Sequence, residues 1–98
     1  MLHIVNKSPM GNGTLQSCLE TAAGGDVLLI EDAVYAATVG NSAAGLIAQA
    51  GKKFRLHVLQ PDLDARGMGD KLLDGVTPVD YAGFVGLVAS NKNCQSWL

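Results

Sequence analysis

Val27-Leu28-Leu29-Ile30 decides the fold of this 98-residue chain, because its four residues are apolar without interruption. A strand with one face in water alternates apolar and polar residues. A continuous apolar run is instead typical of a strand covered on both faces, as in a parallel sheet. Glu31-Asp32 then ends the run. The stretch therefore predicts a buried strand in an α/β sheet.

Three other segments are predicted to be strands of the same sheet. Leu2–Val5 is short and apolar. Phe54–Leu59 alternates apolar with polar residues, which indicates less complete burial. Val76–Val79 contains Pro78, which lacks a backbone N–H and so favours an edge position.

Helical segments separate these strands. Asn12 or Thr14 is a candidate cap of the first helix, and Ser42 of the third. Asp80 is the candidate cap of the last helix, in which apolar residues recur at i, i+3, i+4 and i+7. The predicted helices cover Leu15–Ala22, Ala33–Thr38, Ala43–Ala50, Pro61–Gly67, Met68–Asp74 and Tyr81–Val88.

With the two short helices Pro61–Gly67 and Met68–Asp74 counted as one connection, the element order is β-α-β-α-α-β-α-β-α. This order predicts an α/β fold with a small open, mostly parallel β-sheet and helices on both faces. Residues 1–98 are expected to form a single domain, with Asn91–Leu98 as a polar tail up to Trp97. Ligands of such sheets bind at the carboxyl ends of the strands. Ser8–Gly13, Glu31–Tyr35 and Pro61–Gly67 are therefore expected on the functional edge.

The composition excludes several classes of function. The net charge is −2 and no basic stripe is present, so we expect no direct binding to nucleic acid. No apolar run approaches the ~20 residues that cross a bilayer, and the start lacks a signal peptide's basic lead, so a cytoplasmic protein is expected. Only 16% of residues are charged, against about 25% in ordinary domains. This low share of charged residues favours an oligomer, and the alternative is a small, well-packed monomer.

Cys18 is the first candidate for chemistry. A thiol can attack a persulfide and hold the transferred sulfur, and a position near a helix N-terminus favours the required thiolate. Cys18 also shares an apolar periodicity with Leu15, Leu19 and Ala22, so packing in the core is the alternative. Cys94 lies in the polar tail, and whether it pairs with Cys18 is not apparent from the sequence.

The other polar residues are expected to have structural roles. His3 and His57 are interpreted as partly buried strand residues. Met10–Thr14 lacks the glycine and lysine pattern of a phosphate loop, and no cofactor or metal site is predicted. The remaining polar candidates, which are interpreted as turn, helix-capping or solvated side chains, are Asp32, Asp62, Asp64 and Arg66.

Several blocks in the same order resemble the DsrH/TusB family, the H-type subunit of the DsrEFH/TusBCD sulfur-relay complexes. The resemblance covers nearly the whole chain. The blocks are Met1–Pro9, Val27–Ala37, Leu59–Gly67, Val79–Val85 and Gln95–Leu98.

The resemblance implies a small α/β subunit that assembles with DsrE/TusD-type and DsrF/TusC-type sister subunits into a heterohexamer. Composition and motifs, as set out above, lead us to expect no cofactor, no direct nucleic-acid contact and no membrane contact. Such complexes pass sulfur between donor and acceptor proteins as a cysteine persulfide, so the chain would be a sulfurtransferase subunit rather than a stand-alone enzyme. Ser17-Cys18-Leu19 matches the cysteine-bearing DsrH branch, which serves sulfur oxidation.

The resemblance therefore favours a sulfur carrier that uses Cys18. The alternative is a non-catalytic assembly subunit of a TusBCD-type complex, which serves 2-thiolation of the wobble uridine in transfer RNA. A third interpretation, a free-standing domain that binds a nucleotide or small molecule, is disfavoured by the missing phosphate loop.

Overall fold

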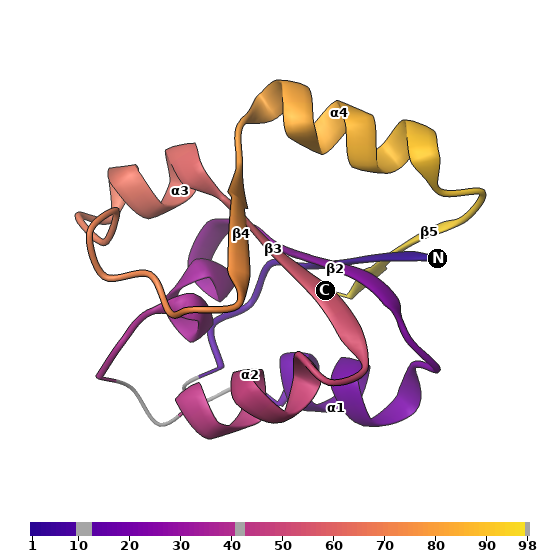
Figure 1. The fold of residues 1–98 in the computed structure, drawn as a ribbon, viewed down its shortest axis with the longest axis horizontal. Helices are drawn as coiled ribbons and strands as arrows, with labels where there is room; N and C mark the ends of the chain where they lie inside the picture. Colours follow the sequence, from indigo (N-terminus) through magenta and orange to yellow (C-terminus); the bar gives the residue numbers. More distant parts are fainter. Residues whose placement is uncertain (10–12, 41–42, 98) are drawn as a thin grey trace.

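The computed structural model describes residues 1–9, 13–40 and 43–97. Five strands form one sheet in the order β4-β3-β2-β1-β5, and all neighbouring strands run parallel (Figure 1). The predicted α/β fold with a parallel sheet is thereby confirmed. The strands are β1 (Leu2–Val5), β2 (Gly25–Leu29), β3 (Phe54–Leu59), β4 (Val76–Val79) and β5 (Cys94–Trp97).

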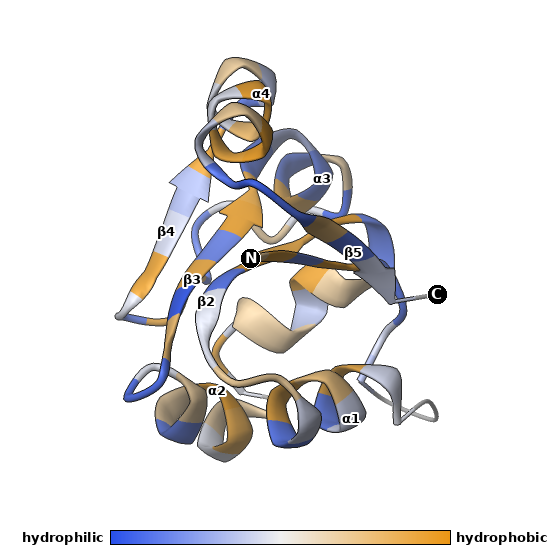
Figure 2. Ribbon diagram, turned by 90° about the vertical axis from the view of Figure 1, so that its right-hand side faces the viewer, coloured by the Kyte–Doolittle hydropathy of each residue, from blue (hydrophilic) through white to orange (hydrophobic). Residues whose placement is uncertain are grey.

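Helices cover both faces of the sheet, as predicted. The helices α1 (Thr14–Thr21) and α2 (Ala44–Ala50) lie on one face, and α4 (Tyr81–Ser90) lies on the other (Figures 1 and 2). The 3₁₀-helix η1 (Glu31–Ala37) follows β2, and α3 (Gln60–Ala65) follows β3. Both therefore lie at the carboxyl ends of the strands.

The main core lies between the sheet and the helices α1 and α2, and it is almost entirely aliphatic. The strand β2 is its central strand, and Val27, Leu28 and Leu29 have no exposed surface. A continuous apolar run thus corresponds to a strand covered on both faces, as expected. Gly25 begins this strand with φ of 107°, and a Cβ atom there would lie 2.5 Å from the carbonyl oxygen of Met1.

Several local predictions are confirmed. Asp80 caps α4, and its carboxylate accepts a hydrogen bond of 2.8 Å from the N–H of Gly83. Pro78 lies in β4, which is an edge strand. The candidate cap Thr14 is not confirmed: it is the first residue of α1, and the N-cap is Gly13. The candidate caps Asn12 and Ser42 lie outside the described residues.

Two predictions are wrong. The tail contains a fifth strand, β5, which pairs with β1. Met68–Asp74 is not helical, because its backbone pairs with the end of η1: the N–H of Val39 bonds to the carbonyl of Lys71, and that of Leu73 to the carbonyl of Ala37. The segment is therefore a turn followed by a single antiparallel bridge between Leu72 and Thr38.

Within the described ranges, each helix falls short of the length and apolar character that a membrane span requires.

Candidate functional site

Cys18 lies on α1 and points into the main core. It shares the buried face of the helix with Leu15 and Leu19, and its own exposed fraction is 0%. The apolar spacing that predicted the helix therefore also places the thiol beneath aliphatic side chains.

Burial controls the ionisation of this thiol. Desolvation raises the pKa of Cys18 to about 11, because the thiolate loses its hydration. A favourable helix dipole does not offset this effect here. At pH 7 such a thiol is ionised in only about one molecule in 10,000. In the described conformation Cys18 has neither the exposure nor the charge that persulfide exchange needs.

Cys94 is the exposed thiol of the chain. It lies on β5 opposite Leu2 of β1, and both cysteines are free. Leu2 is paired with Asp26 on its other side, so Cys94 shares the sheet face of Asp26, opposite the face that α1 covers. Cys18 and Cys94 therefore lie on different faces of the sheet.

The structure brings two of the three segments of the predicted functional edge together, Glu31–Tyr35 and Pro61–Gly67, while the third, Ser8–Gly13, lies partly outside the described residues. The N–H of Glu31 donates a 2.6 Å hydrogen bond to the carboxylate of Asp62, and Arg66 forms a 3.0 Å ion pair with Asp32. Glu31 holds this position with a positive φ of 50°. Asp64 accepts a hydrogen bond of 2.8 Å from the Gln60 side chain. The first two contacts connect η1 to α3 and the third lies within α3, which agrees with the structural roles predicted for the polar side chains.

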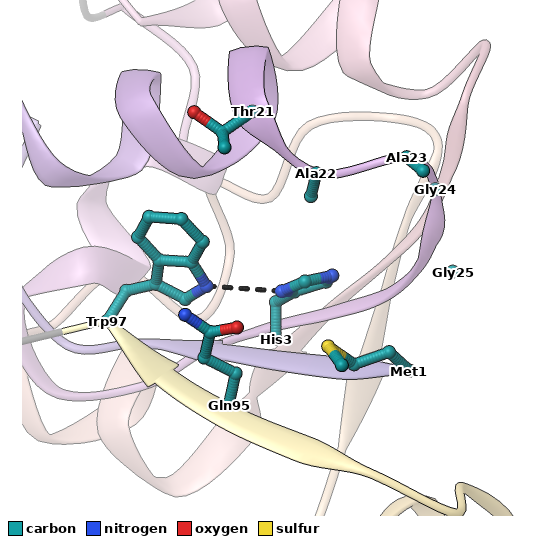
Figure 3. A pocket seen from close by; sticks show the side chains of 9 residues that line it. All are labelled: Met1, His3, Thr21, Ala22, Ala23, Gly24, Gly25, Gln95 and Trp97. Atoms are coloured by element: carbon teal, nitrogen blue, oxygen red, sulfur yellow. Dashed lines mark hydrogen bonds between the residues drawn. The ribbon is translucent and has the colours of Figure 1, made fainter.

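A hollow of about 580 Å³ lies at the opposite, amino-terminal end of the strands (Figure 3). Trp97 and His3 face each other across it, and the indole N–H donates a 3.1 Å hydrogen bond to Nδ1 of His3. His3 is buried, and desolvation lowers its pKa, so the ring stays neutral. The role predicted for His3, that of a satisfied strand residue, fits this geometry. The hollow is lined by Met1, His3, Thr21, Ala22, Ala23, Gly24, Gly25, Gln95 and Trp97.

An ion-pair network centred on the buried carboxylate of Asp26 lies on the sheet face beneath α4. The carboxylate of Asp26 accepts hydrogen bonds of 2.8 and 2.9 Å from Arg55, 3.0 Å from His57 and 3.2 Å from Asn91. The Arg55 bond holds the pKa of Asp26 well below its usual range, although desolvation opposes this shift. Asn91 follows α4 directly, so the network connects the end of that helix to the sheet.

The sequence offered a partial signal for this network. The positions of Arg55 and His57, two residues apart on one strand, place both side chains on the same face. Asp26 comes from a neighbouring strand in register with Arg55. Only the strand pairing reveals that the three side chains meet.

The helix α4 is apolar but poorly covered. Its sequence YAGFVGLVAS contains no charge, and each of its residues is at least partly exposed. Tyr81 is 62% exposed, Val85 67% and Val88 42%. Figure 2 shows the hydrophobic turns of α4 at the outside of the molecule. A large apolar side chain rarely remains outside as part of a connected patch unless a partner covers it.

The protein is thus a small parallel-sheet α/β domain with a buried cysteine and an uncovered apolar helix. Two solved structures share this fold: the ychN protein of E. coli (TM-score 0.76, 18% identity, 97% of each chain covered) and MTH1491 of Methanobacterium thermoautotrophicum, a protein of unknown function (TM-score 0.75, 17% identity, 97% of this chain and 95% of that one).

The sequence comparisons identify the family. The profile of the DsrH-like proteins matches residues 7–94. The TusB proteins of Serratia proteamaculans, Shigella flexneri and Erwinia tasmaniensis are 33%, 30% and 34% identical over 97 residues, with 99% of this chain and 100% of each relative covered. The chain belongs to the DsrH/TusB family, which confirms the resemblance. Its place in the cysteine-bearing branch stays a prediction.

Proposed function

We propose that this chain is a non-catalytic assembly subunit of a TusBCD-type sulfur-relay complex, which serves 2-thiolation of the wobble uridine in transfer RNA. Family membership supports the sulfur-relay role. Relatives named TusB along the full chain favour the transfer-RNA branch over sulfur oxidation. The proposed partners are the DsrE/TusD-type and DsrF/TusC-type sister subunits, in a heterohexamer.

The burial of Cys18 carries this proposal. Sulfur moves between proteins when a thiolate attacks the outer sulfur of a persulfide, so the two sulfur atoms must come into contact. Cys18 has no exposed surface, and its pKa of about 11 keeps it protonated. A subunit with such a cysteine contributes surface and stability to the complex while a partner's cysteine carries the sulfur.

The competing proposal is the sulfur carrier of a DsrEFH-type complex, with Cys18 as the acceptor. The cysteine in the first helix favours it, through the resemblance of Ser17-Cys18-Leu19 to the cysteine-bearing branch. This role requires a second conformation, in which α1 moves away from the sheet and uncovers the thiol.

Thiol labelling of the native chain tests the two proposals. Iodoacetamide is added at pH 7, and each cysteine is followed by mass spectrometry of its peptide. Exposed Cys94 is an internal reference in the same molecule. The assembly role predicts that Cys94 reacts at the rate of a free thiol and that Cys18 reacts more than 100-fold more slowly. In 6 M urea the two rates should become similar.

Sulfur loading gives the second readout. The chain is incubated with a persulfide donor, alone and with its sister subunits, and the mass of the Cys18 peptide is measured. One additional sulfur on Cys18, together with loss of relay in a Cys18→Ala complex of normal size, would refute the assembly role. An unloaded Cys18 and normal relay through the Cys18→Ala complex support it.

A further inference from the structure

The outer face of α4 is the surface that the fold leaves without a cover. Its inward-facing residues, Gly83, Phe84 and Leu87, are only half-buried on the sheet. Its outward face carries the large side chains of Tyr81 and Val85. A membrane is a poor occupant for this face, because the helix is only ten residues long and lacks a flanking basic face.

The charges at the two ends of α4 indicate which occupant fits. Asp80 is exposed at the start of the helix, and Lys92 is exposed just after its end. Each lies six residues from Gly86, and the ten residues of the helix between them are uncharged. If two such helices pack antiparallel about an axis near Gly86, the acidic end of each meets the basic end of the other. Parallel packing would bring like charges together.

Gly86 allows a close approach at the centre of this arrangement. It is exposed, and a Cβ atom placed there would meet nothing within 4 Å in its own chain. Ala82 and Ala89 share the outward face with it, at small-residue spacing along the helix. Two backbones can therefore come together here, with Val85 of each copy packed beside the crossing point.

We infer that α4 is a self-complementary contact helix, which packs antiparallel on α4 of a second copy of this chain about a two-fold axis near Gly86. Such an isologous contact uses the same patch on both copies. The area that one ten-residue helix can bury is smaller than the ~800 Å² per partner of a standard interface. The isolated chain should therefore dimerise weakly, with a Kd on the order of 10–100 μM, and the contact gains strength inside a larger assembly.

Sedimentation equilibrium of the full chain from about 1 μM to 1 mM measures this association. Val85→Lys should weaken the dimer about 100-fold, because the two-fold axis places the new charge in the contact twice. Ser90→Lys is the matched control on the same helix, since residue 90 is exposed and lies about 140° around the helix from residue 85. It should leave the Kd within about threefold, and both variants should keep the circular dichroism of the parent.

Cysteine crosslinking locates the axis. In a Cys94→Ser background, Gly86→Cys should form an intermolecular disulfide under mild oxidation, because residues next to a two-fold axis face each other within disulfide reach. Gln16→Cys, on α1 at the other face of the sheet, should form no intermolecular disulfide under the same conditions.

Three results would overturn the inference. They are a chain that stays monomeric to 1 mM, a dimer that Val85→Lys leaves intact, and an α4 that a sister subunit covers while a second copy of this chain does not. The inference rests on the proposed assembly role, but the two fail separately. Sulfur on Cys18 would refute the assembly role and leave the α4 dimer standing. A monomer would refute the α4 contact and leave an inert Cys18.

Discussion

Replacing Asp26 by Asn tests how the polar network beneath α4 stabilises the fold. The carboxylate is 6% exposed and has three side-chain donors: Arg55, His57 and Asn91. Asn keeps the shape and removes the charge. Breaking a buried ion pair costs about 3–5 kcal/mol, but the Arg55 side chain is 74% exposed and water screens it. We expect Asp26→Asn to lower the free energy of unfolding by about 2–3 kcal/mol at pH 7.

The pH dependence of stability gives a sharper readout. The native pKa of Asp26 lies below its unfolded value of about 3.9, so its contribution is complete above that value and is lost as the pH falls. Urea unfolding of the parent should therefore show decreasing stability from about pH 5 downward. Asp26→Asn should show a shallower slope in that range. The control Asp74→Asn, which changes an exposed carboxylate, should follow the parent.

Equal slopes for the parent and Asp26→Asn would refute this reasoning, since the charge of Asp26 would then contribute nothing to the acid response. A loss below about 0.5 kcal/mol at pH 7 would indicate that solvent screens the whole network as it screens a surface pair.

Three further substitutions probe the fold by urea unfolding. Gly25→Ala should cost more than about 2 kcal/mol, because the methyl group would meet the Met1 carbonyl at 2.5 Å and φ is positive, whereas Gly45→Ala in an open part of α2 should stabilise by about 0.5–1 kcal/mol. A Gly25→Ala variant as stable as the parent, or a loss of stability in Gly45→Ala, would contradict this pair of expectations. Asp80→Ala should cost about 1 kcal/mol through the lost cap, and Asp80→Asn should cost little; equal losses would mean that the charge, not the cap, matters. Cys18→Ser should cost about 1–3 kcal/mol, more than Cys18→Ala, because it buries a hydroxyl group; the reverse order would place position 18 in contact with water.

The parts of the fold that follow local rules could be predicted from the sequence. The continuous apolar run of β2 predicted that this strand is buried inside the sheet, because a strand covered on both faces has no place for polar residues. Asp80 predicted the start of α4, since its carboxylate accepts a hydrogen bond from an N–H that has no partner within the helix.

The parts of the fold that depend on pairing between segments far apart in the sequence could not be predicted. The strand β5 contains only one apolar side chain besides its cysteine, and it forms because β1, more than 90 residues earlier, offers it a free edge. Met68 and Leu72 have helical spacing, yet Leu72 forms an antiparallel bridge with Thr38 instead. Local periodicity contains no information about these partners.

The candidate site shows the same division. The sequence placed Cys18 on the apolar face of a helix and left its role open between packing and sulfur transfer. The α4 surface was not predicted, because its spacing of apolar residues is that of a helix with a buried face. Only the structure shows that Tyr81, Val85 and Val88 of that helix remain exposed.

Cys18 can act as a sulfur carrier only if α1 moves away from the sheet and uncovers the thiol. Uncovering the thiol also exposes Leu15 and Leu19, which are 1% and 7% exposed, at a cost of about 1.5–3 kcal/mol each. A cost of about 3–6 kcal/mol leaves between about 1 in 160 and about 1 in 25,000 molecules open. Only a partner that binds the open form can raise this fraction. Sulfur transfer through Cys18 therefore predicts that the sister subunits accelerate its alkylation at least tenfold, whereas the assembly role predicts a rate that they leave unchanged or lower.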